Sequence, residues 1–179
     1  MQHGFVKVAA AAPALRIADP MYNAEKIGEV IQRCADDGVK VLVLPELALT
    51  GATCGDLFYQ NTLLRGAVMA LEKLMELTIG ADMLTFVGLP VEKDGKIYNC
   101  AAAVCDGDLL GVVPMRTPGD KHFAVADDKV REVKAFETQL VEMASARITI
   151  DLDDGVKANY PKFYPLVEPI KGLESSNDN

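Results

Sequence analysis

The sequence predicts an α/β domain in which a parallel strand–helix–strand unit leads into an antiparallel meander. Two apolar runs, residues 5–12 and 39–44, flank a stretch with helical periodicity, which is the pattern of a right-handed parallel crossover. Two tight-turn signals, Asp94-Gly95 and Asp106-Gly107, follow between further apolar runs and favour hairpins. The layers expected from these elements are helix, sheet and helix.

The first element is a short strand over residues 5–12, which Pro13 closes. A helix follows, for which Asn23 is the expected N-cap. Gly38 is placed to end this helix. Its apolar side chains recur at i, i+3, i+4 and i+7, which predicts one buried face made of Ile27, Val30, Ile31 and Cys34.

Residues 39–44 are the central strand of the prediction. Only Lys40 interrupts the apolar run, so we expect a strand buried on both faces. Pro45 cannot donate a ladder hydrogen bond and should end it, which places Glu46 just past its carboxyl end. Ligands collect at this edge of open α/β sheets. Glu46 is therefore a candidate general base, and the alternative is a strand-end glutamate that faces water or caps a turn.

The remaining elements of the domain follow from periodicity and turn residues. A glycine-containing loop leads into a second helix over about residues 57–77, whose apolar stripe is expected to pack in the core. Strands are predicted over residues 84–90, 96–105 and 109–113, joined by the two Asp-Gly turns. Cys100 and Cys105 fall within the second of these strands and are expected to be buried structural thiols.

Composition narrows the classes of function. The formal net charge of −8 argues against nucleic acid and against an anionic membrane surface as partners. No apolar run is long enough to span a bilayer, and no secretory signal is recognised. The four cysteines have no C-x-x-C spacing, so we expect reduced thiols and a cytoplasmic protein. His3 and His122 are too isolated to indicate a metal site, and no cofactor is predicted.

Three stretches carry a resemblance to a known family. They are FVKVAAAAP, VLVLPELALTGATCGDLF and FVGLPVEKDGKIYNCAAAVCDGDLLGVVP. Together they resemble the carbon–nitrogen hydrolase (nitrilase) superfamily, and more closely the N-terminal glutaminase domain of glutamine-dependent NAD+ synthetases, over about residues 3–114. The resemblance implies a partial nitrilase-like α-β-β-α sandwich. It also implies a Glu–Lys–Cys triad acting on glutamine or a small amide, with Glu46 as the general base.

The chain departs from the family pattern at the other two triad positions. After Pro114 the family continues with a lysine-bearing loop, whereas this chain runs directly into Met115-Arg116 and Thr117-Pro118-Gly119. Lys121 lies beyond that turn and is not assigned the lysine's role. None of the cysteines precedes an acidic residue in a C-E-D-like context, and Cys54, in the loop after Glu46, is the only thiol near the expected site. Glu46 and Asp56 would disfavour its thiolate.

The last third of the chain differs in character. We expect a domain over residues 1–119, a polar linker over 120–130, a helix plus strand or hairpin over 131–174, and a disordered tail over 175–179. The segment 151–155 (DLDDG) lacks the ligand pattern of a calcium loop and indicates a tight turn. Residues 136–174 resemble the C-terminal tail of adenine-specific DNA methyltransferases of bacterial defence systems, a resemblance that implies no methyltransferase chemistry. This part is the small α+β C-terminal appendage of the prediction.

The sequence thus indicates a glutaminase-like carbon–nitrogen hydrolase domain that is catalytically incomplete, so whether the chain is an enzyme stays open. The alternatives are a non-catalytic interaction or assembly module and a gene-fusion fragment without evolved activity. A sheet that lacks its later strands should expose an edge or an apolar face. We therefore expect self-association, or a partner chain, at the exposed sheet.

Overall fold

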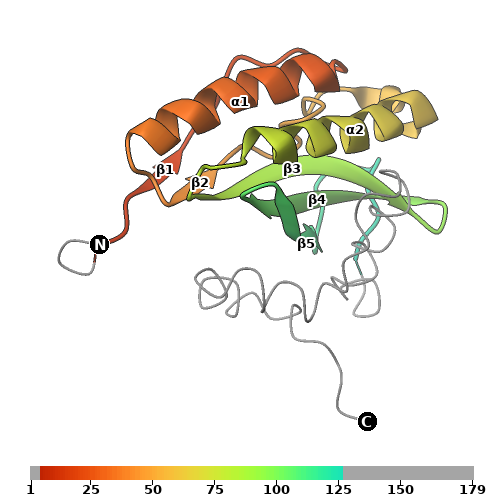
Figure 1. Ribbon diagram of the computed structural model, residues 1–179. Coiled ribbons are helices and arrows are strands. Elements are labelled where there is room, and N and C mark those ends of the chain that lie inside the picture. Colours follow the sequence, from red (N-terminus) through yellow and green to blue (C-terminus); the bar gives the residue numbers. More distant parts are fainter. Residues whose placement is uncertain (1–4, 127–179) are drawn as a thin grey trace, which may run out of the picture.

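One mixed sheet and two helices make up the protein in the computed structural model, which describes residues 5–126. The five strands lie in the order β1-β2-β3-β4-β5, and α1 and α2 lie side by side on one face of the sheet (Figure 1). This is the predicted α/β class, but the expected helix, sheet and helix layering is wrong for residues 5–126, because both helices cover the same face of the sheet. The predictions for residues 127–179 lie outside the described residues. The elements are β1 (Val8–Ala10), α1 (Pro20–Asp36), β2 (Val41–Val43), the short 3₁₀ helix η1 (Gly55–Tyr59), α2 (Asn61–Leu77), β3 (Leu84–Lys93), β4 (Lys96–Cys105) and β5 (Asp108–Pro114).

The N-terminal half forms the predicted parallel unit. β1 pairs with β2 in parallel, and β2 pairs with β3 in parallel. Both first strands have only three residues, so they are shorter than the apolar runs that predicted them. The flanking residues continue with single bonds, for example from the Leu44 N–H to the Phe86 carbonyl at 3.0 Å. The apolar runs therefore mark burial as well as ladder pairing.

The expectation that residues 39–44 are buried on both faces is wrong. Leu42 is fully buried beneath the helices, whereas the next side chain, Val43, is 47% exposed on the other face. Side chains alternate across a strand, so the helix-covered face contributes Leu42 to the core. The opposite face of β2 remains open in the region of Val43.

Helix α1 begins three residues before the predicted N-cap. Asp19 is the actual N-cap, because its carboxylate accepts from the Tyr22 N–H at 3.3 Å and Pro20 fits the first turn. Asn23 is instead fully buried, and its side chain bonds the backbone of Arg16 and the carbonyl of Leu49. It thus joins the loop before α1 to the loop that follows β2. At the other end Gly38 has φ +71°, as predicted for a helix terminus.

The second helix and the core agree with the apolar pattern. Residues 55–59 form a 3₁₀ helix before α2 starts, so the predicted helix begins with a break. The buried side chains of α1 and α2 pack with Leu42 and with the helix-facing side chains of β3, β4 and β5 in one large cluster. This packing fixes the sheet against its helical layer.

The meander was predicted most closely. β3 pairs with β4 and β4 with β5, both antiparallel. Asp94 and Gly95, and likewise Asp106 and Gly107, all have positive φ, as hairpin turns of this kind require. β4 has the predicted bounds, and a register shift at Ala103/Val104 interrupts its pairing with β5.

Residues after β5 return across the domain. Phe123 is 6% exposed, and its ring contacts that of Phe58 at a centroid separation of 4.8 Å. The Ala124 N–H donates to the Ile97 carbonyl at 2.7 Å. Residues 120–126, the start of the segment assigned to a linker, therefore pack on η1 and β4. Within residues 5–126 no helix is long and apolar enough to cross a membrane.

Candidate active site

Glu46 lies in a tight loop directly after β2, as predicted. Leu47, the next residue, has φ +52°, a left-handed conformation that is uncommon for a residue other than glycine and that often marks functional sites. The loop is held by bonds from the Gly51 N–H to the Leu47 carbonyl at 2.7 Å and from the Leu49 N–H to the Gly88 carbonyl at 3.0 Å. The carboxylate is thus carried by a constrained backbone.

Gly88 on β3 makes this loop possible. A Cβ on Gly88 would lie 2.3 Å from the Leu47 nitrogen and 2.8 Å from the Pro45 carbonyl oxygen. Both are backbone atoms, so the loop can cross the strand at this distance only over a glycine. The sequence pattern, in which Gly88 is one residue of an apolar strand, gives no sign of this role.

The partner of Glu46 is Asn99 on β4. The Asn99 Nδ2 donates a hydrogen bond to Glu46 Oε1, and Asn99 itself is 4% exposed. The same nitrogen lies 3.8 Å from the Met115 sulfur, and the Met115 N–H donates to the Asn99 carbonyl at 2.6 Å. Sequence reasoning missed Asn99, because an amide inside a strand pattern gives no periodic signal.

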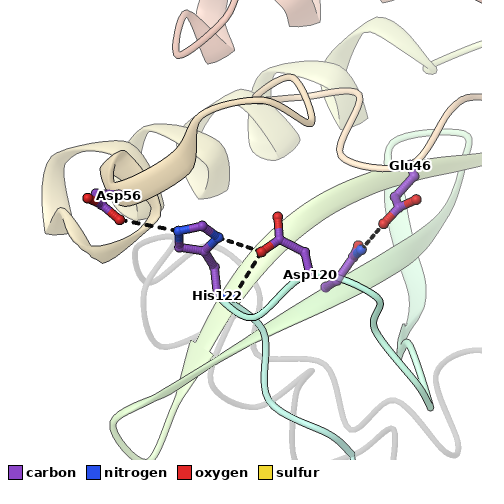
Figure 2. A network of polar contacts seen from close by, with 5 residues as sticks. Glu46, Asp56, Asp120 and His122 are labelled. Atoms are coloured by element: carbon purple, nitrogen blue, oxygen red, sulfur yellow. Dashed lines mark hydrogen bonds and ion pairs between the residues drawn. The ribbon is translucent and has the colours of Figure 1, made fainter.

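Glu46 and Asn99 border a cavity of about 320 Å³. The cavity lies where β2, β3, β4 and β5 approach one another, on the face of the sheet that the helices do not cover. Its other walls are mainly apolar and include Val43, Phe86, Ala101, Val113 and Met115. A mostly apolar pocket with a few convergent polar groups is the usual form of a small-molecule site. Figure 2 shows the Glu46 carboxylate directed at the side-chain amide from which it accepts a hydrogen bond.

The cysteines do not supply an activated nucleophile among the described residues. The Cys54 thiol donates to the Thr50 carbonyl at 3.1 Å, and burial raises its pKa. Cys100 borders the cavity, yet its side chain belongs to the helix-side core, where burial raises its pKa strongly. Cys105 is also buried, as expected. Thiolates are the reactive form of cysteine, so both Cys54 and Cys100 are held as thiols.

The structure brings together a second polar group that the sequence did not indicate. His122 Nδ1 lies 2.5 Å from Asp120 Oδ1, and His122 Nε2 lies 3.3 Å from Asp56 Oδ1 on η1 (Figure 2). The hydrogen bond to Asp120 raises the pKa of His122, and the His122 backbone and side chain lower the pKa of Asp120. This group, the Asp56–His122–Asp120 chain, ties the segment after β5 to the loop that precedes α2.

Neither a metal centre nor the triad lysine is formed by the described residues. Residues 5–126 contain no group of three His, Cys, Asp or Glu side chains suited to a metal ion. No lysine of this region lines the cavity, and Lys121 lies exposed on the segment after β5. What the site can do chemically is accept a proton and accept hydrogen bonds, through the Glu46 carboxylate.

Comparison with known proteins identifies the family of this chain. The family model described as carbon-nitrogen hydrolase matches residues 7–157, a range that extends beyond residue 119. Among curated relatives, the glutamine-dependent NAD(+) synthetase of Mycobacterium tuberculosis is 41% identical over 115 residues, which is 63% of this chain and 17% of the relative. That of Thermotoga maritima is 27% identical over 134 residues, covering 75% of this chain and 23% of the relative. The chain therefore spans only about a sixth to a quarter of these proteins.

Solved structures show the same fold. The glutamine-dependent NAD(+) synthetase of Cytophaga hutchinsonii superposes with a TM-score of 0.61 at 25% identity, covering 69% of this chain and 22% of that one. A mutant of the amidase from Nesterenkonia sp. AN1, solved in complex with butyramide, gives a TM-score of 0.61 at 18% identity, covering 69% of this chain and 49% of that one. The sheet, its helical layer and the matched family model all lead to one assignment: this chain belongs to the carbon–nitrogen hydrolase family, with a domain that resembles the glutaminase domain of glutamine-dependent NAD+ synthetase.

Proposed function

We propose that the domain recognises a carboxamide, such as that of glutamine, in the cavity beside Glu46, and that Glu46 is the proton acceptor that it would contribute to hydrolysis once the missing catalytic groups are supplied. The observation that carries this proposal is the Glu46 carboxylate at the carboxyl end of β2, bordering a cavity with Asn99. The names of the curated relatives support glutamine as the amide. Ammonia released from it would serve a synthetase domain elsewhere.

We further propose that the chain as it stands does not turn over glutamine. Amide hydrolysis by a covalent route needs an activated nucleophile and a preorganised donor for the oxyanion. Residues 5–126 place neither a thiolate nor a lysine at the cavity. Loss of an oxyanion donor alone costs roughly 10²–10³ in rate. Residues 127–179 contain lysines but no cysteine, so a nucleophilic thiol would have to come from another chain, whereas the lysine could come from either source.

Two measurements test these statements. Ammonia release from glutamine by the full chain should equal the buffer blank, and Glu46→Gln should leave it unchanged. Turnover that Glu46→Gln abolishes would refute the statement of incompleteness.

Amide recognition is tested separately by titrating ¹⁵N-labelled protein with butyramide. Shifts confined to the cavity residues are expected, and no shift at millimolar butyramide would refute recognition.

A second function is favoured by one observation, the open face of the sheet. Val8 is 67% exposed, Val43 47% and Val113 37%. Large apolar side chains gathered on one face of a sheet mark interaction sites. We therefore keep an assembly module as the alternative, with a second copy or a partner chain on this face. Light scattering tests it: self-association supports this role for a second copy, and a monodisperse monomer argues against it.

Two further points stay proposals. We propose the cytoplasm as the compartment, because the four cysteines have no C-x-x-C spacing and do not suggest a disulfide framework. We also propose that residues 136–174 share their origin with methyltransferase tails. The family match overlaps this segment up to residue 157, and no chemistry is assigned to it.

A further inference from the structure

Asn99 occupies a fixed place between the strands that border the cavity. It pairs with Pro90 of β3 in the antiparallel ladder, and its own carbonyl accepts the Met115 N–H at 2.6 Å. Its backbone is therefore tied to β3 on one side and to the end of β5 on the other. A side chain that starts from such a backbone has few positions available.

The side-chain amide is almost completely buried and has a specific partner. Asn99 is 4% exposed, and its Nδ2 donates to Glu46 Oε1 across a separation of 53 residues in sequence. A buried amide that lacks a partner is costly, so the contact serves the stability of Asn99 as well as the orientation of Glu46. Met115 Sδ lies 3.8 Å from the same nitrogen and is its second neighbour besides Glu46.

Glu46 by itself has little else to orient it. It is an exposed residue with three rotatable side-chain bonds, and such side chains sample several rotamers when free. Its backbone is constrained by the loop over Gly88, but the loop does not determine where the carboxylate points. Among the described residues, the bond from Asn99 is the only hydrogen bond or ion pair that this carboxylate makes.

We propose that Asn99 is a positioning residue that holds the Glu46 carboxylate in one orientation beside the cavity. Because Oε1 accepts the Asn99 amide, Oε2 is the oxygen left to accept a proton or a hydrogen bond from a ligand. An amide nitrogen donates without exchanging its proton with the carboxylate, so it orients Glu46 and does not compete as an acid or base. The relevance of this role to catalysis rests on the proposed function of Glu46.

The experiment measures the rotamer of Glu46 directly, in the full chain and without ligand. Three-bond couplings about χ1 and χ2 of Glu46 should report a single rotamer in the unaltered protein. Asn99→Leu removes the donor at similar size, and Asn99→Asp keeps the shape but replaces the donor with an acceptor. Both variants should give averaged couplings at Glu46. The control is Thr85→Val, a buried change on β3 that lies on the helix-covered face, and it should leave the couplings unchanged.

The outcomes are distinct. Averaged couplings in the unaltered protein, or a single rotamer in a folded Asn99 variant, would overturn the proposal. A further measurement needs no Asn99 variant: the Asn99 Nδ2 proton should shift upfield in Glu46→Gln, where the acceptor loses its charge, and an unchanged shift would also overturn the proposal. Butyramide binding is assayed separately. If Asn99 orients Glu46 but butyramide does not bind, the proposed function fails while the positioning role stands.

Discussion

Replacing Gly88 with alanine tests the close crossing of the Glu46 loop over β3. The new Cβ would lie 2.3 Å from the Leu47 nitrogen, 2.8 Å from the Pro45 oxygen and 2.9 Å from the Glu46 carbonyl carbon, whereas ordinary contact begins at 3.4 Å. The loop must therefore retreat by about an ångström. Overpacking of this kind costs roughly 1–3 kcal/mol, and the Leu49–Gly88 hydrogen bond adds about 1 kcal/mol if it breaks.

We therefore expect Gly88→Ala to lower the free energy of unfolding by about 2–4 kcal/mol, a large share of the stability of an ordinary domain. Urea unfolding followed by circular dichroism measures this change, and the midpoint should fall by roughly 1–2 M. Gly119→Ala is the matched control, because a Cβ added there would meet no atom of the described residues within 4 Å and no left-handed φ is involved. A Gly88→Ala variant within about 0.5 kcal/mol of the original protein would refute the reasoning.

Three further predictions concern other groups. Thr85→Val should raise the free energy of unfolding by about 1 kcal/mol, because the fully buried Thr85 hydroxyl has no hydrogen-bond partner among residues 5–126. Urea unfolding measures this gain, and a loss of stability would contradict it. The hydrogen bond to Asp120 raises the pKa of His122, so its stabilisation is complete below the ordinary value of 6.5 and is lost as pH rises through the raised pKa. Unfolding measured from pH 6 to 9 should show this loss, and His122→Gln should remove it. In the native protein, iodoacetamide should modify the half-buried Cys34 before the buried Cys54, Cys100 and Cys105. Mass spectrometry of digests measures the order of labelling, and earlier labelling of a buried thiol would contradict this prediction.

Local signals explain which parts of the fold the sequence predicts well. β4 has the predicted bounds because an Asp-Gly turn with positive φ limits it at each end. The start of α1 was misplaced because Asn23 has the chemistry of an N-cap, yet its amide bonds the backbone of Arg16 and Leu49. Whether an asparagine caps a helix or bridges two loops depends on tertiary contacts, which the local pattern does not contain.

The residues of the site also differ in whether a local sequence pattern or a long-range contact reveals them. The position of Glu46 shortly after β2 was predicted because a strand that ends at a proline is a local feature. Asn99 was missed because its importance comes from a contact with a residue 53 positions away. The Asp56–His122–Asp120 chain likewise joins a loop before α2 to a segment after β5, and no pattern in either segment indicates the other.

The two kinds of strand pairing also imply an order of folding. The pairs of β3 with β4 and of β4 with β5 are closed by two-residue turns, whereas β1, β2 and β3 pair in parallel across intervening helices. Hairpins form in roughly 1–10 μs, and long connections must first lose more chain entropy. We therefore expect the meander to form before β2 docks on its edge. Asn99 would then already lie in a formed ribbon, and Glu46 would reach it only in the final association of the two halves.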